Sequence, residues 1–134
     1  MRRLAAFLAL VLLAGCDSNQ DPITCDDPSV EIETEDVLLG TGAVANARSV
    51  VVVAYRGTLD DGTVFDENTN AQFSLAGTVS GFREGVSGMR VGGRRRIVIP
   101  PLRGYGAVPR GSGDSAIPAC STLNFDVTLR DING

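Results

Sequence analysis

The sequence predicts an α+β fold, in which an antiparallel sheet of about five strands is wrapped around one short helix. Two observations lead to this prediction. Short runs rich in β-branched residues recur along the chain, and turns containing glycine, aspartate or proline separate them. One window, residues 82–89, instead has the apolar spacing of a helical face. With 134 residues, of which 43% are hydrophobic, the chain has the size and composition of one domain.

The N-terminus has the pattern of a signal peptide over residues 1–15. Arg2 and Arg3 precede an apolar run over residues 4–13, and two small residues follow it. The run is too short to span a bilayer comfortably, because a membrane helix needs about 20 apolar residues. We therefore expect residues 1–15 to be removed on export.

Cys16 follows that signal in the sequence LAGC, which resembles the lipobox of bacterial lipoproteins. The resemblance implies cleavage before Cys16 and lipidation of this cysteine, and several acyl chains together give stable anchoring. A plain secretion signal with an incidental cysteine is the alternative. Residues 16–29 are polar and rich in aspartate, so we expect an acidic tether ahead of a domain over residues 30–134. The predicted location is the cell envelope, on a bacterial membrane and facing the periplasm or the exterior.

The first half of the domain is predicted to form strands. A strand over residues 30–38 ends at the Gly-Thr-Gly turn of residues 40–42. Residues 49–59 are too rich in β-branched side chains and too short for a helix, which predicts a central strand. The sequence Asp-Asp-Gly at residues 60–62 then predicts a hairpin turn into a strand over residues 63–66.

The second half is predicted to hold the helix and a long loop. A short strand is expected over residues 71–75, followed by the helix over residues 82–89. Residues 94–100 predict a strand that two consecutive prolines end. Residues 101–119 are rich in glycine and proline and predict an ordered loop. Apolar and polar residues alternate over residues 121–132, which predicts a half-buried last strand.

Cys25 and Cys120 are left once Cys16 is assigned to the anchor. An even pair of cysteines in an exported chain favours a disulfide. Two free thiols are the alternative, because sequence alone does not place the two Cα atoms within bridging distance.

Composition excludes several kinds of chemistry. The chain has no histidine, lysine or tryptophan, so imidazole catalysis, histidine metal sites and lysine Schiff bases are ruled out, and we expect no metal and no cofactor. The net charge is −4. The one basic cluster, Arg94, Arg95 and Arg96, is interpreted as strand residues with solvated faces rather than as a phosphate site. We therefore expect no nucleic-acid partner.

Four motifs occur in order along the domain. They are VAYRGTLDDGTVFD, FSLAGTVSGFREGVSGMRVGG, RRRIVIPPLRGYG and IPACSTLNFDVTL. Together they resemble the FK506-binding (FKBP) domain over residues 30–132. The resemblance implies an FKBP-like fold and a peptidyl-prolyl cis-trans isomerase that acts on X-Pro bonds of unfolded or partly folded exported proteins. It also implies a pocket for FK506-like macrolides, and a reaction that needs no nucleophile, general acid or general base.

The FKBP resemblance implies the pocket residues motif by motif. Phe82 would form the floor under the prolyl ring, while the Val79 amide and the Tyr105 hydroxyl would each donate to a substrate carbonyl. Asp66, hydrogen-bonded to Tyr55, would orient the polar rim. The implied catalytic residues are Asp66, Tyr105 and Tyr55, and the implied substrate-binding residues are Phe65, Val79, Phe82, Ile117 and Phe125.

The chain departs from the family pattern at two places in this pocket. Phe82 stands where the family usually has tryptophan, which removes an indole donor and leaves an apolar floor. Residues 70–72 lack the aromatic residue that often precedes the strand holding Phe73, so we expect one thin wall.

Structural readings of the same residues stay open at this point. Phe65, Phe125 and Tyr55 could be ordinary core residues, and Asp66 could be a turn residue. The alternative function is a proline-binding chaperone or docking module with little turnover. A purely structural envelope lipoprotein is a further alternative.

Overall fold

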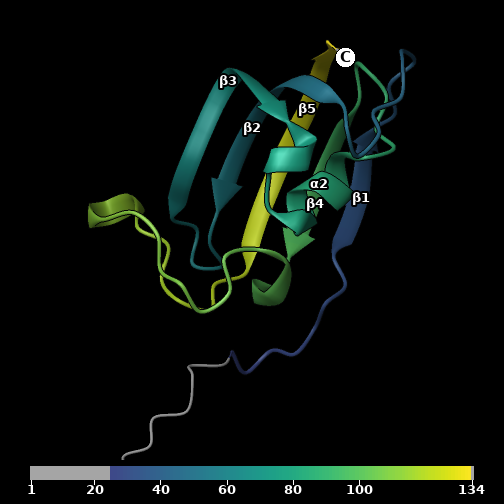
Figure 1. Ribbon diagram of the computed structural model, residues 1–134. Coiled ribbons are helices and arrows are strands. Elements are labelled where there is room, and N and C mark those ends of the chain that lie inside the picture. The colour runs from purple at the N-terminus through teal and green to yellow at the C-terminus, as the bar shows by residue number, and fades with distance from the viewer. Residues whose placement is uncertain (1–24, 134) are drawn as a thin grey trace, which may run out of the picture.

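The chain folds as a five-stranded antiparallel sheet with a short α-helix on one of its faces (Figure 1). This structure is a computed structural model, and it describes residues 25–133. The predicted signal peptide, the anchor Cys16 and the first part of the tether lie outside the described residues. The strands are β1 (Glu33–Leu38), β2 (Val50–Thr58), β3 (Val64–Ser74), β4 (Arg94–Ile99) and β5 (Leu123–Ile132), and the helix is α2 (Ser80–Val86). Among residues 25–133, no helix has the length and apolar character needed to cross a membrane.

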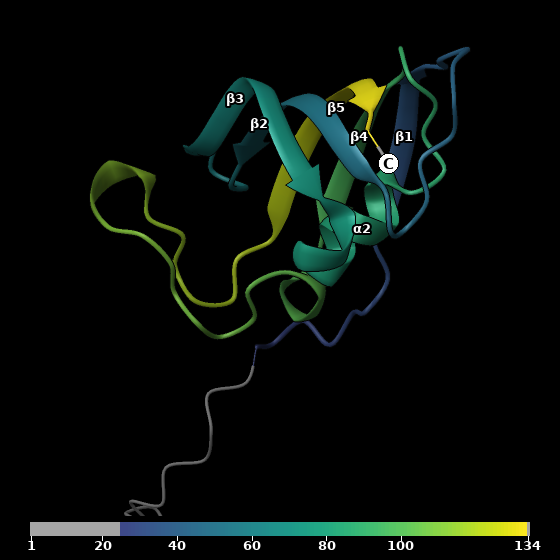
Figure 2. The same cartoon turned by 45° about the horizontal axis from the view of Figure 1, so that its top comes forward.

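The strands lie in the order β1-β4-β5-β2-β3, and every neighbouring pair is antiparallel. The helix α2 covers the inner face of this sheet, and the segment between β4 and β5 extends beside the ends of β2 and β3 (Figures 1 and 2). The predicted α+β class is confirmed. The predicted loop holds two 3-10 turns, Pro101–Arg103 and Gly113–Ser115.

Two glycines let α2 lie close on β4. A Cβ atom at Gly81 would stand 2.4 Å from Ile99 Cγ2, and one at Gly85 would stand 2.6 Å from Ile97 Cγ2. Both isoleucines are fully buried. Because a side chain at either glycine would push the helix off the sheet, the glycines bring the helix start close to the strands that form the core.

The core lies between α2 and the inner face of the sheet. Alternate residues of the central strands point into it, because side chains along a strand alternate between the two faces. The core includes Val51 and Val53 of β2, Ile97 and Ile99 of β4, and Leu123, Val127 and Leu129 of β5, together with Leu75 and Val86, all of them fully buried.

Arg95 departs from the interpretation of the arginine run as strand residues with solvated faces. Its side chain lies on the inner face and is only 14% exposed. It donates to the carbonyls of Gly85 and Ser87 at the C-terminal end of α2 and pairs with Asp36. A cation there satisfies carbonyls that have no partner within the helix. Arg94 and Arg96 are exposed on the outer face, as predicted.

Several predicted boundaries need correction. The two short strands predicted around residues 63–66 and 71–75 are one strand, β3, because Glu67 and Asn68 between them pair with the neighbouring β2 at the sheet edge. The helix begins and ends earlier than residues 82–89. Val79 already occupies the extended N-cap position, and Gly88 at φ +91° ends the turn that follows the helix.

The outer face of the sheet carries a row of charges that crosses all five strands. Its members alternate in sign and lie in register: Glu67, Arg56, Asp126, Arg96 and Glu35, called here the charge ladder. Ion pairs of 3.9 Å, 4.0 Å and 3.4 Å join Arg56 to Glu67, Arg96 to Asp126 and Arg96 to Glu35. Opposite charges directly across neighbouring strands favour this register.

Candidate functional site

A cavity of about 380 Å³ opens on the inner face of the sheet, beside the start of α2 and the loop between β4 and β5. Its size is at the lower end of the range for small-molecule pockets. Its walls are aromatic, with a few polar groups at the rim. The lining residues are Tyr55, Phe65, Asp66, Phe73, Gly77, Thr78, Val79, Phe82, Tyr105, Arg110 and Phe125.

Phe82 forms the bottom of the cavity. It is 4% exposed and packs edge-to-face on Phe125 and Phe73, with ring centroids 5.1 Å and 5.7 Å away. Phe65 meets Phe125 in the same way at 5.5 Å. Such contacts stabilise aromatic pairs beyond the area that they bury, so the four rings form one rigid apolar surface.

Gly57 makes room for these rings on β2. A Cβ atom at this position would lie 2.5 Å from Phe65 Cζ and 3.0 Å from Phe125 Cε1. The glycine of the VAYRG motif is therefore required by the close approach of two cavity rings to the backbone.

A β-bulge explains how two consecutive residues of β3 both reach the cavity. The register between β2 and β3 shifts between Gly57 and Thr58, so that Asp66 lies opposite Gly57 while Phe65 is left without an opposite residue. Side chains of a regular strand would point to opposite faces, whereas a bulge re-aims one of them. Phe65 thus adds an aromatic wall beside the Asp66 carboxylate.

Tyr55 and Asp66 form the polar side of the rim. The Tyr55 hydroxyl donates to the Asp66 carboxylate over 2.6 Å. Burial, then this hydrogen bond and the negative charge of Asp66, raise the pKa of Tyr55. Tyr55 therefore stays protonated as a donor, and its hydroxyl holds the carboxylate beside the rings.

Val79 places a backbone donor beside the floor. It is the N-cap residue of α2, with φ −60° and ψ 150°, and its N–H donates to no acceptor among residues 25–133. The residue before it closes the preceding 3-10 turn, because the Thr78 hydroxyl donates to the Leu75 carbonyl over 2.9 Å. The Val79 amide is thus available to a carbonyl of a bound molecule.

Tyr105 closes the cavity from the loop side, and Arg103 fixes the loop just before it. The Arg103 side chain donates to Ser80 Oγ over 2.9 Å and to the Val30 carbonyl over 2.7 Å, and it pairs with Glu84. This network ties the loop both to α2 and to the N-terminal segment. Tyr105 and Phe82 both line the cavity.

The structure joins Cys25 and Cys120 in a disulfide, with Cα atoms 5.2 Å apart. That separation lies within the usual bridging range. The Cys120 N–H also donates to the Gly106 carbonyl over 2.8 Å. The bond therefore fastens the N-terminal segment to the base of the loop that carries Tyr105.

Ile117 is the one predicted binding residue that the structure does not bring to the cavity wall. It is 7% exposed and belongs to the apolar core. Its backbone pairs with Arg110 in an isolated antiparallel bridge. Arg110, its partner in that bridge, lines the cavity.

Sequence reasoning omitted four lining residues, Phe73, Gly77, Thr78 and Arg110. Phe73 lies two residues after the buried Ala71, so strand alternation was a signal that could have placed it on the inner face. Its ring centroid lies 5.6 Å from that of Tyr55. Arg110 gives no comparable signal, since it lies in an irregular loop.

Comparison with protein families shows which family this fold represents. Residues 42–130 match the family described as FKBP-type peptidyl-prolyl cis-trans isomerase. The chain belongs to this family. FK506-binding protein 3 of Candida albicans is 45% identical over 103 residues, which are 72% of this chain and 23% of the relative. The isomerase FkpA of Escherichia coli is 39% identical over 69% of this chain and 34% of the relative.

A solved structure extends this FKBP-type comparison. The peptidyl-prolyl cis-trans isomerase of Pseudomonas syringae superposes with a TM-score of 0.69 at 31% identity, over 97% of this chain and 95% of that one. The crystal structure of FkpA gives the same TM-score at 37% identity over 76% of this chain and 48% of the FkpA chain. The chain spans 23% to 34% of the length of the two curated relatives named above.

The chemistry that this FKBP-type cavity offers is binding rather than bond cleavage. Its ionisable groups are one carboxylate, one guanidinium and two phenols. Residues 25–133 hold no cluster of three or more histidine, cysteine, aspartate or glutamate side chains that could bind a metal ion. An apolar ring can pack on the aromatic floor, while the Val79 amide and the Tyr105 hydroxyl can donate to carbonyls beside it.

Proposed function

We propose that this chain catalyses cis-trans isomerisation of X-Pro peptide bonds. The observation that carries the proposal is the cavity built on Phe82, in which four phenylalanine rings and two tyrosines surround a space suited to a prolyl ring. The membership of the FKBP-type family supports it. The names of the relatives give the same activity for the proteins of Escherichia coli and Pseudomonas syringae.

The proposed catalysis depends on how tightly the cavity binds a twisted amide. An X-Pro bond isomerises unaided in tens to hundreds of seconds, because rotation breaks its partial double bond. Twisting localises the nitrogen lone pair and reduces charge separation. The transition state therefore loses less hydration free energy than the planar amide when it moves from water into the cavity. A cavity that binds the twisted form more tightly than either planar isomer therefore accelerates rotation.

Three groups would position the substrate for this rotation. Phe82 would hold the prolyl ring, and the Val79 N–H and the Tyr105 hydroxyl would each donate to a substrate carbonyl. Asp66, fixed by its 2.6 Å hydrogen bond from Tyr55, would hold the polar rim in place. No proton transfer is needed, in agreement with a chain that has no histidine or lysine.

Nuclear magnetic resonance exchange spectroscopy on a capped Ala-Leu-Pro-Phe peptide tests the activity without a coupling protease. We expect micromolar protein to raise the exchange rate well above the thermal rate, and Tyr105→Phe to lower it about threefold to tenfold, as expected for one lost hydrogen bond. The matched control is Arg48→Gln, because Arg48 is exposed and is not among the residues that line the cavity. Peptide binding without acceleration would contradict the proposal and favour the non-catalytic proline-binding module.

We also propose that the protein acts in the cell envelope of a bacterium, lipid-anchored through Cys16, with exported proteins as its substrates. The LAGC sequence after an apolar run supports the anchor, and the disulfide between Cys25 and Cys120 suits an oxidising compartment. Mass spectrometry of the membrane fraction should find the acylated N-terminal peptide, and Cys16→Ser should release the protein. Recovery of an unmodified Cys16 in a soluble fraction would contradict the anchor.

FK506-like macrolides are a second proposed ligand class of the same cavity. The names of several relatives record FK506 binding for those proteins. Isothermal titration with FK506 tests this directly, and Phe82→Ala should abolish the heat of binding, because the ring under the ligand is removed.

A further inference from the structure

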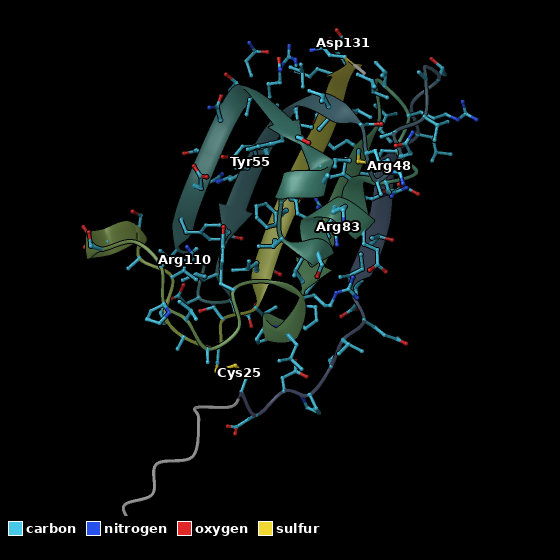
Figure 3. All side chains as sticks on the ribbon, viewed as in Figure 1. Cys25, Arg48, Tyr55, Arg83, Arg110 and Asp131 are labelled. Atoms are coloured by element: carbon cyan, nitrogen blue, oxygen red, sulfur yellow. A yellow bond between two sulfur atoms is a disulfide. The ribbon has the colours of Figure 1, made fainter. Side chains whose placement is uncertain are left out.

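Arg110 is a cation at the mouth of the cavity that has no anionic partner in the described part of the chain. Most arginines of the sheet and loop are paired: Arg56, Arg94, Arg95, Arg96 and Arg103 each form an ion pair. Arg110 forms none with residues 25–133, and it is exposed. Figure 3 shows it on the loop beside the ends of β2 and β3, whereas Arg48 lies on the opposite side of the view.

Two contacts fix Arg110 in this position. Its N–H donates to the Ile117 carbonyl over 2.9 Å, and its carbonyl accepts from the Ile117 N–H over 2.8 Å. Because the Ile117 side chain is buried, this bridge anchors an otherwise exposed loop. The Arg110 guanidinium also lies 4.8 Å from the centroid of the Tyr105 ring, within the range of a cation-π contact.

The acidic groups nearby leave this charge available. Asp66 is the carboxylate that lines the cavity, and it accepts the Tyr55 hydroxyl. Asp114 lies in the same loop as Arg110 but is exposed in the turn Gly113–Ser115 and forms no ion pair within residues 25–133. The guanidinium can therefore donate to a group that enters with the substrate.

We propose that Arg110 makes this isomerase favour peptides with an acidic side chain next to the proline. The inference rests on the proposed function, since it concerns substrate choice at the same cavity. A guanidinium and a carboxylate form charge-assisted hydrogen bonds, which are stronger than neutral ones. Because Arg110 is exposed, solvent and salt screen the attraction, so the preference is modest and falls with ionic strength.

The test compares capped, uncharged-end peptides that carry Glu, Gln or Lys directly before or directly after the proline. Exchange spectroscopy gives kcat/KM for wild type, Arg110→Gln, Arg110→Lys, Arg110→Glu and the control Arg48→Gln. We expect wild type to favour Glu over Gln about threefold at low salt at one of the two positions. The ratio should fall to about one in Arg110→Gln, stay high in Arg110→Lys and Arg48→Gln, and invert in Arg110→Glu.

The two proposals fail in different ways. The role of Arg110 is overturned if the wild-type kcat/KM ratio of the Glu to the Gln peptide is near one, or if Arg110→Gln keeps the wild-type ratio. In both cases turnover of the Gln peptide still upholds the isomerase. No turnover of the Gln peptide overturns the isomerase. In that case chemical-shift titration gives the dissociation constants of the Glu and Gln peptides. Equal constants in wild type, or an affinity ratio that Arg110→Gln leaves unchanged, would then overturn the role of Arg110.

Discussion

The two faces of the sheet carry opposite chemistry, although the same strands supply both. On β2, Tyr55 lines the cavity while its neighbour Arg56 belongs to the charge ladder. On β5, Phe125 lines the cavity while Asp126 belongs to the ladder. The inner face is held mainly by buried apolar contacts, with the Arg95–Asp36 pair at its β1 side, and the outer face by ion pairs in contact with water.

The difference shows where stability and function are concentrated. Burying a large apolar side chain stabilises a fold by about 1.5 to 3 kcal/mol. An exposed ion pair contributes about 0 to 1 kcal/mol, and Arg56 and Glu67 are both 62% exposed. Substitutions on the inner face should therefore affect both folding and turnover, whereas those on the outer face should affect stability slightly and turnover not at all.

Phe82→Ala should give the largest effect on both properties. Removing a buried phenylalanine costs about 3 to 5 kcal/mol of unfolding free energy, because a cavity replaces its contacts. The prolyl ring also loses its floor, so we expect kcat/KM to fall at least about 100-fold. Urea unfolding and exchange spectroscopy measure the two effects. Val52→Ala, half-buried on the outer face of β2, is the control, and an equal loss of turnover there would break the comparison.

Gly57→Ala should give the next largest effect, because it adds one methyl group inside the aromatic wall of the cavity. The new Cβ would lie 2.5 Å from Phe65 Cζ, so the ring must move. Overpacking of this kind costs about 1 to 3 kcal/mol, and we expect kcat/KM to fall about tenfold as the wall shifts. Thr58→Ala on the outer face should leave turnover unchanged. Normal turnover in Gly57→Ala would show that the wall is pliable.

Much of the fold was predictable because it rests on local patterns. The β-branched run of β2 and the alternation in β5 indicate strands with one buried face, and both strands are found. The full length of β3 was not predictable, since the residues between Asp66 and Ala71 are polar. They remain in a strand because hydrogen bonds to β2 hold them, a long-range effect that local propensity does not record.

The sequence motifs predicted much of the cavity lining, whereas the placement of residues in the loop between β4 and β5 was not predictable. The structure brings Tyr55, Asp66 and Phe82, which the ordered motifs singled out, to one cavity. Ile117, predicted at the cavity, is buried in the core instead, whereas Arg110, for which no role was predicted, lines the cavity. No periodic pattern describes an irregular loop, so sequence alone does not show that placement.

Tyr55→Phe should have a smaller effect that depends on pH. Losing the hydrogen bond to Asp66 should cost about 1 kcal/mol near neutral pH and lower kcat/KM about threefold. The folded-state pKa of Tyr55 is raised above its ordinary value, first by burial and then by Asp66. The wild-type stability from this group is therefore complete below about pH 10 and is lost as pH rises further, because only the unfolded chain ionises.

Guanidinium unfolding of both proteins from about pH 8 to about pH 11 measures this dependence. The gap in unfolding free energy between wild type and Tyr55→Phe should narrow at the alkaline end. A gap that stays constant over this range would show that the hydroxyl titrates alike in the folded and unfolded states.

Asp126→Asn should give the smallest effect, and it isolates the outer face. The hydrogen bond from Arg94, followed by the charges of Arg94 and Arg96, lowers the pKa of the Asp126 carboxyl. Its contribution is thus present above the ordinary aspartate pKa of about 4 and is lost as pH falls through the lower folded-state value. At pH 7 we expect a loss below about 1 kcal/mol in unfolding free energy, since solvent screens the pair.

As pH falls through the lowered folded-state pKa of Asp126, the two proteins should converge in stability, because the wild-type carboxyl becomes protonated as well. High salt at pH 7 should also reduce the difference, and kcat/KM should stay at the wild-type value throughout. Turnover that fell together with the charge would mean that the outer face acts on the cavity through β5. The effect would then pass through Phe125, the neighbour of Asp126 that lines the cavity, and the two faces would not be independent.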